Sequence, residues 1–137
     1  MSEACRGPGY TPEDLADIPG TTVFTIADAR RAYALHQFCM SLMKPANRAA
    51  FKSDERTYLA QFPMTDDQRE GVRARDFNRL IALGGNIYFL VKISSTDGWS
   101  VQKAVAAMSG MSAEQYGAMM LAGGRSPEGN RSIRRGC

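Results

Sequence analysis

Residues 84–98 contain Gly84-Gly85-Asn86-Ile87-Tyr88-Phe89-Leu90-Val91-Lys92, followed closely by Ser95-Thr96-Asp97-Gly98. The paired glycines are typical of a helix end, because glycine adopts the left-handed conformation found there without steric cost. The block from Ile87 to Ile93 has the β-branched and aromatic content of a buried strand. No second segment is a candidate to pair with it, and an isolated strand leaves backbone polar groups unsatisfied. The block is therefore predicted to be a helix, and the Thr-Asp-Gly segment after it a turn.

Capping signals, glycines and prolines delimit four further predicted helices. They run from the Thr25–Asp28 capping box to Lys44, from Ala46 to Phe62, from the Thr65–Gln68 capping box to Leu83, and from the Ser112–Gln115 capping box to the glycines at 123 and 124. The sequence predicts an all-α, multihelical single domain over residues 1–137. It has an irregular N-terminal arm (1–24), a helical body (25–124) and a basic C-terminal tail (125–137), and arms of this kind usually wrap around a partner.

The helix predicted to end at Lys44 carries apolar residues in two stripes. One stripe is Ala29, Tyr33, Met40 and Met43, and the other is Ala32, Leu35, Cys39 and Leu42. A helix that is apolar on two sides is expected to be covered on two sides.

The formal charge of the 137-residue chain is +3, and the tail carries all of it. Residues 125–137 hold four arginines and one glutamate, while acidic and basic residues balance elsewhere. Four arginines without interleaved aromatic residues are a weak signature of nucleic-acid binding. No nucleic-acid partner is predicted, and a solvated tail or one docked on an acidic protein surface is favoured.

Other compositional signals exclude several classes of protein. No apolar run is long enough to span a bilayer and the first residues do not form a signal peptide, so no membrane partner and a cytoplasmic location are expected. Cys5, Cys39 and Cys137 are odd in number and widely spaced, which fits neither a disulfide framework nor a zinc site. Cys39 is predicted to be a buried thiol on a helix.

Several further segments carry a family resemblance. They are Asp17-Ile18-Pro19-Gly20-Thr21, Val23-Phe24-Thr25, Gln37-Phe38, Met40-Ser41-Leu42-Met43-Lys44, Phe51-Lys52, Asp54-Glu55, Met108-Ser109-Gly110-Met111, Gly123-Gly124-Arg125-Ser126-Pro127 and Arg131-Ser132-Ile133. Together with the stretch at 84–98, their order resembles the small alpha subunit of protocatechuate 4,5-dioxygenase. The resemblance covers nearly the whole chain from Asp17 onward.

This resemblance implies a role in the catabolism of aromatic compounds, including lignin degradation. The enzyme of that family is an oxidoreductase that opens protocatechuate with O₂ to 4-carboxy-2-hydroxymuconate semialdehyde, by extradiol ring cleavage. Its Fe(II) is bound by a catalytic beta subunit, the expected partner here, in an α₂β₂ heterotetramer or similar assembly. The aromatic acid substrate would lie at the subunit interface. A related gallate or substituted-protocatechuate dioxygenase, and a stand-alone helical interaction module, are the alternatives.

The residues themselves argue against catalysis by this chain alone. Non-haem Fe(II) oxygenases commonly use two histidines and one carboxylate as ligands, and this sequence has one histidine, His36. That residue is predicted to be a packed or surface histidine in the middle of a helix. No nucleophile elbow or activated thiol is evident, so no catalytic residue and no metal ligand are assigned.

The resemblance also implies a lid over the partner's active site, formed by the segment after the Thr-Asp-Gly turn. Here the lid residues would be Trp99, Ser100, Val101 and Gln102. The family leads us to expect phenylalanine at position 101, and lysine is common at position 99. Trp99 is either an interface anchor or packs back onto the Ile87–Ile93 helix. The alternative for the whole segment is a turn without ligand contact.

Overall fold

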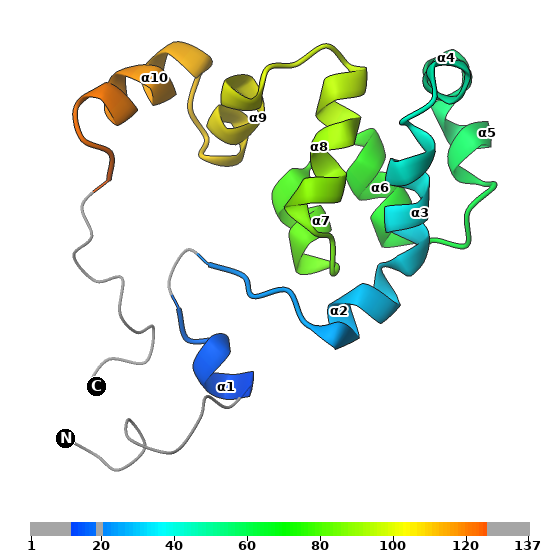
Figure 1. Ribbon diagram of the computed structural model, residues 1–137, viewed down its shortest axis with the longest axis horizontal. Helices are drawn as coiled ribbons and strands as arrows, with labels where there is room; N and C mark the ends of the chain where they lie inside the picture. Colours follow the sequence, from blue (N-terminus) through cyan, green and yellow to red (C-terminus); the bar gives the residue numbers. More distant parts are fainter. Residues whose placement is uncertain (1–11, 19–20, 126–137) are drawn as a thin grey trace. The chain divides into compact units, whose positions relative to one another are not determined.

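The computed structural model describes residues 12–18 and 21–125, and every regular element in these ranges is a helix (Figure 1). The helices are α1 (Pro12–Leu15), α2 (Ile26–Arg31), α3 (Tyr33–Ser41), α4 (Pro45–Ser53), α5 (Glu55–Leu59), α6 (Asp66–Arg73), α7 (Phe77–Ala82), α8 (Ile87–Thr96), α9 (Val101–Met108) and α10 (Ala113–Leu121). The predicted all-α class is confirmed. None of these helices is long and apolar enough to cross a membrane.

The residues from Phe24 to Gly123 form one compact unit, and the described residues outside it belong to a second unit. In that second unit the backbone N–H of Thr21 donates to the carbonyl of Ile18. Most of the predicted N-terminal arm and nearly all of the basic tail lie outside the described residues, as do Cys5 and Cys137.

The apolar block that begins at Ile87 forms helix α8, as predicted. Gly84 ends α7 with φ +100°, a conformation that favours glycine. The Asn86 side chain then accepts the backbone N–H of Tyr88 and caps α8. Leu90 and Ile93 on α8 are completely buried, which accounts for the strongly apolar sequence of this helix.

Three predicted long helices are each interrupted, so those predictions of continuity are wrong. Residues 46–62 divide at Asp54, whose extended backbone (φ −154°, ψ 92°) and carboxylate cap α5 by accepting the N–H of Thr57. Residues 65–83 divide at Arg75, which has φ +54°, and Asp76 then caps α7 by accepting the N–H of Arg79. A capping carboxylate offers the backbone an alternative to continuing the helix, and here that alternative prevails.

The predicted helix ending at Lys44 divides at Ala32 (φ −105°, ψ 13°) into α2 and α3. The Thr25–Asp28 capping box at its start is confirmed. At the break, the carbonyl of Arg31 accepts a hydrogen bond at 3.1 Å from Nε2 of Gln68 on α6. The same Nε2 donates to the carbonyl of Leu83 at 3.3 Å, beyond the end of α7. Gln68 is buried, and it therefore ties the ends of two helices to a third.

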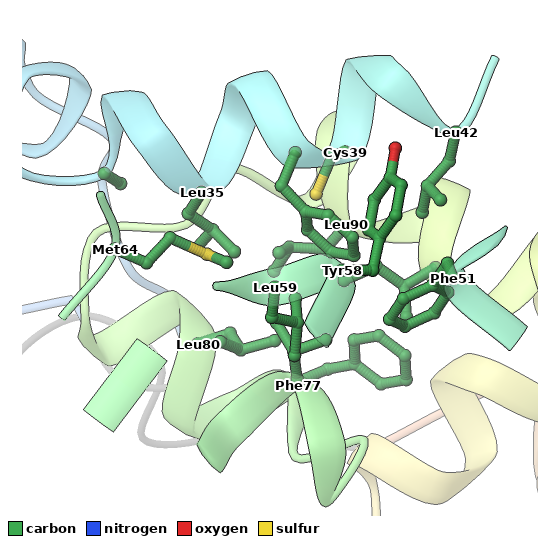
Figure 2. Packing of buried hydrophobic residues seen from close by; sticks show 14 residues of the cluster. Leu35, Cys39, Leu42, Phe51, Tyr58, Leu59, Met64, Phe77, Leu80 and Leu90 are labelled. Carbon is green, nitrogen blue, oxygen red and sulfur yellow. The ribbon is translucent and has the colours of Figure 1, made fainter. Parts of the chain in front are cut away.

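The core fills the space between the helices from α3 to α8 (Figure 2). Its largest completely or almost completely buried side chains are Leu35, Phe38, Phe51, Leu59, Val72, Leu80, Leu90 and Ile93. The Phe38 ring packs edge-on against the rings of Phe51, Tyr58 and Phe62, with centroids 5.1–6.0 Å apart. Such contacts add to the stabilisation from burial, and they fix the positions of α4 and α5 on α3.

The two apolar stripes of α2 and α3 have different environments. Ala32, Leu35, Cys39 and Leu42 are buried in the core, as a core-facing stripe requires. Tyr33, Met40 and Met43 from the other stripe are 64%, 45% and 60% exposed. Within this chain, then, the helix is covered on one side and open on the other.

Helices α9 and α10 complete the unit, α9 packing on α8 and α10 on α9. The capping box from Ser112 to Gln115 is present as predicted and starts α10. Helix α9 was not predicted. It begins with Ser100, whose hydroxyl accepts the N–H of Lys103, and its alanines at 104 and 106 are buried.

Candidate functional site

The Thr96–Gly98 turn, which precedes the predicted lid residues, is fixed by the partly buried side chain of Arg75. Nε and Nη2 of Arg75 reach the two carboxylate oxygens of Asp97 at 2.6 and 3.2 Å. Nη2 also pairs with Glu55 at the start of α5, and Nη1 donates to the carbonyl of Val72. These charge-assisted bonds join α5 and the end of α6 to the turn. Partial burial lowers the pKa of the Arg75 guanidinium, whereas the hydrogen bonds and charges of Asp97 and Glu55 raise it. The carboxylates have the larger combined effect, and the pKa lies above its usual value.

Trp99 packs back onto the body of the unit, while its role as an interface anchor stays a prediction. Its ring meets that of Phe77 on α7 edge-on, with centroids 6.4 Å apart, and it contributes to the edge of the core. The contact is with α7, although the prediction named the helix at 87–93. Nζ of Lys103 lies 4.5 Å from the centroid of the Trp99 ring, which is a cation–π contact.

The other three predicted lid residues have separate roles in the local structure. The Ser100 hydroxyl caps α9. Nε2 of Gln102 donates to the carbonyl of Ala113 at 2.9 Å, and a Cβ at Gly117 would lie only 2.7 Å from that nitrogen. Gln102 thus holds α9 against α10. Val101 is 68% exposed at the first position of α9. Ser100 and Gln102 are exposed as well, but both side chains make these local hydrogen bonds, so Val101 is the large apolar side chain of the four that projects into solvent.

His36 is packed, as predicted, and its ring is already engaged. It is buried on α3, and its Nε2 accepts the backbone N–H of Asn86 at 2.9 Å. The ring stacks on Phe89 with centroids 4.4 Å apart and lies 5.7 Å from the ring of Phe24. Burial lowers the pKa of His36, because it disfavours the charged imidazolium. A neutral imidazole with its proton on Nδ1 fits this arrangement.

The other reactive group in the body is Cys39, and it is completely buried on α3 as predicted. Burial raises the pKa of its thiol to about 12, so it is not an activated nucleophile. Residues 12–18 and 21–125 contain no group of three His, Cys, Asp or Glu side chains placed to hold a metal ion.

Sequence reasoning did not single out Arg75 or its partner Asp97 as a pair. Asp97 was recognised only as part of a turn, and Arg75 lies 22 residues earlier in a segment predicted to be helical. No local pattern marks a bond over such a separation. A positive φ at a residue other than glycine is uncommon, and at Arg75 it accompanies the helix break that brings the side chain to Asp97.

Comparison with known proteins identifies the family of this arrangement. Residues 35–121, from α3 to the end of α10, match the family described as "Aromatic-ring-opening dioxygenase LigAB, LigA subunit". The chain belongs to the LigA family. The part that matches contains His36, Arg75, the Thr96–Gly98 turn and all four predicted lid residues. This confirms the resemblance to the alpha subunit of such a dioxygenase.

One relative of this LigA-family chain is gallate dioxygenase of Pseudomonas putida. The two proteins are 26% identical over 99 residues, which is 72% of this chain and 29% of that enzyme. The similarity therefore spans less than a third of gallate dioxygenase, and most of that enzyme has no counterpart in the chain described above.

Proposed function

We propose that this chain is the non-catalytic alpha subunit of a ring-opening dioxygenase and acts with a separate catalytic chain of LigB type. The match to the LigA family over residues 35–121 carries this proposal. The substrate class is a catecholic acid, with protocatechuate as the first candidate, opened with O₂ to 4-carboxy-2-hydroxymuconate semialdehyde. The partner would supply the Fe(II) site, in an α₂β₂ or similar assembly located in the cytoplasm.

The chemistry of the donor set supports assigning the iron to the partner. The sequence has one histidine, and its Nε2 accepts a backbone hydrogen bond inside the fold. The residues of this chain therefore do not fit a site of two histidines and one carboxylate, and no step of the reaction is derived through iron in this chain. Gallate dioxygenase is consistent with this division, because most of its length lies outside the part similar to this chain.

Within such an assembly, the segment from Trp99 to Gln102 would cover the mouth of the partner's active site. Trp99 and Gln102 hold this segment on α7 and α10, while Val101 projects outward. Val101 would contact the aromatic acid, and the surrounding residues would exclude water from the reacting centre. Arg75 and Asp97 would keep the preceding turn in place.

A gallate dioxygenase is the second candidate, and the similarity to the Pseudomonas putida enzyme favours it. The experiment that decides between the two is a ring-cleavage assay on protocatechuate, gallate and 3-O-methylgallate, with this chain, a LigB-type chain from the same source and Fe(II). We expect cleavage by the mixture and neither cleavage nor stoichiometric iron binding by this chain alone. Iron binding and ring cleavage by the purified 137-residue chain would contradict the proposal.

The lid role is tested by Val101→Phe in the assembled enzyme. A larger aromatic side chain in the pocket should change the ratio of kcat/KM between protocatechuate and gallate by roughly tenfold or more. Glu114→Gln, an exposed change on α10, is the control. Equal ratios for wild type and Val101→Phe in an intact complex would mean that residues 99–102 do not contact the substrate.

A further inference from the structure

The surface formed by α2, α3 and the start of α8 is unusually apolar for an exposed surface. Seven large hydrophobic side chains are exposed there, and we refer to them as the α3 face: Phe24, Ile26, Tyr33, Met40, Met43, Ile87 and Tyr88. In the part of the chain that the structure describes, α4 to α7 expose no side chain of this kind. Single exposed hydrophobic residues need no explanation, but a group of them on adjoining elements is typical of a binding surface.

The three elements that carry the α3 face meet at His36. The His36 ring packs between those of Phe24 and Phe89, and its Nε2 is bonded to the backbone just before α8. Tyr33 and Met40 lie one helical turn before and after His36 on α3. The tyrosines, methionines and phenylalanine of this surface are residue types that are enriched in protein–protein interfaces.

The charges around the α3 face are mainly positive, and the one acidic residue of α2, Asp28, is paired with Arg31. From Ala29 to Ser53 the sequence contains five basic residues and no acidic residue, and the only charged residue of α8 is Lys92. Nζ of Lys92 bonds to the carbonyl of Tyr88 and lies 5.7 Å from the centroid of the Phe89 ring. Ion pairs with carboxylates are formed by Arg31, Arg69, Arg73, Arg75 and Arg79.

We infer that the α3 face is the surface by which this subunit binds its catalytic chain, and that the catalytic chain presents an apolar patch bordered by acidic side chains. This inference rests on the proposed function. The positive border requires an occupant of opposite charge. A second copy of this chain does not meet that requirement, because a two-fold contact would place the same positive border on both sides.

The decisive measurement is the dissociation constant between this chain and the LigB-type chain from the same source, by titration calorimetry. Met40→Glu adds a charge at the centre of the α3 face, at a position already 45% exposed, so folding is not at risk. We expect it to weaken binding by about tenfold or more. Gln61→Glu adds the same charge at an exposed position after α5, and we expect binding equal to that of wild type.

Lys44→Glu tests whether the positive charges around the α3 face contribute to binding. Wild-type binding should weaken as NaCl is raised, and Lys44→Glu should bind more weakly and with less dependence on salt.

If wild type binds the LigB-type chain and Met40→Glu binds it equally well, this inference is overturned while the proposed function stands. If wild type does not bind that chain, both are overturned. A discrete dimer of this chain that Met40→Glu dissociates, or tighter binding to phosphatidylserine vesicles than to the LigB-type chain, would assign the surface to another occupant and overturn the inference.

Discussion

Arg75 has a backbone conformation that favours glycine and a side chain that glycine could not supply. Its φ of +54° places it in the left-handed region, which costs an ordinary residue about 1–2 kcal/mol. Its partly buried guanidinium bonds to both Asp97 and Glu55, and each hydrogen bond to a charged group contributes about 1.5–3 kcal/mol. The larger of these free energies belongs to the side chain, so arginine at this position stabilises the fold despite the strain.

This comparison predicts an order of stability for two variants. Arg75→Ala loses the ion pairs and keeps the backbone strain, while Arg75→Gly loses the ion pairs and relieves the strain. We expect both to unfold at lower urea concentration than wild type, with Arg75→Gly more stable than Arg75→Ala by about 1 kcal/mol. Arg79→Ala, which removes an exposed pair with Asp67, is the control and should cost under about 1 kcal/mol. Equal stability of the two Arg75 variants would mean that the backbone is not strained there.

His36 gives the stability of the protein a pH dependence with a defined sign. Its pKa is lowered in the folded state, so the unfolded chain takes up the proton first as the pH falls. The stability from neutral His36 is fully present above the unfolded pKa of about 6.5, and it decreases from that pH down to the lowered pKa of the folded state. We expect the urea concentration at the unfolding midpoint to decrease as the pH is lowered from 7.5 to 5.5.

The sequence contains no other histidine, which makes the assignment testable. In His36→Gln, the side-chain oxygen can still accept the N–H of Asn86, and no proton is taken up in this range. The urea midpoint of this variant should change much less between pH 7.5 and 5.5. A wild-type midpoint that rises on acidification would contradict the buried, neutral state of His36.

At the scale of elements, Gln68 has a role that its place in a capping box does not reveal. Its Oε1 accepts the N–H of Thr65, as in any such box. Its Nε2 also donates to two backbone carbonyls, those of Arg31 and Leu83. Gln115 occupies the same position in the capping box of α10, but it is exposed and makes only the local bonds. The two glutamines are thus a matched pair.

We predict that Gln68→Glu is strongly destabilising and Gln115→Glu is close to neutral. Glutamate can replace glutamine within a capping box, so the local cap persists in both variants. Only at position 68 does a buried carboxylate then face two carbonyls without a proton to donate, which should cost about 3 kcal/mol or more. Chemical denaturation of the two variants measures the difference, and similar stabilities would show that the bonds from Nε2 contribute little.

The sequence predicted features that a few neighbouring residues determine. The capping boxes at Thr25, Thr65 and Ser112, the end of α7 at Gly84 and the helix at Ile87 are such features, and all are confirmed. The breaks at residues 32 and 75 were missed because distant bonds stabilise them, such as that from Gln68 to a carbonyl 37 residues away.

At the candidate site, too, local features could be predicted from the sequence and bonds between distant residues could not. The position of the site after the turn at residues 96–98 could be predicted from the sequence, and the family match includes it. The support from Arg75 could not be predicted, because Asp97 lies 22 residues further along the chain. Whether residues 99–102 contact a substrate stays a prediction.

At the scale of the whole molecule, α3 has one side in the core and the other exposed, with Tyr33, Met40 and Met43 in contact with solvent. A partner that binds the folded chain and not the unfolded one raises stability by mass action, by about 2.7 kcal/mol at a partner concentration one hundred times the dissociation constant. We predict a rise in Tm of about 10 °C or more in the complex, measured by calorimetry. A Tm that the LigB-type chain leaves unchanged would contradict this prediction, and a chain lacking any interaction with it, such as lysozyme, is the control.

Burial of Cys39 gives the protein an internal reporter of its own motions. The reactive form of a thiol is the thiolate, and a pKa of about 12 together with complete burial keeps this form out of reach of an alkylating reagent. Reaction therefore requires α3 to separate from the core, and the rate of alkylation measures how often this happens. A chain bound to the opposite side of the same helix would restrain it, so the lifetime of the Cys39 thiol would report assembly from inside the subunit.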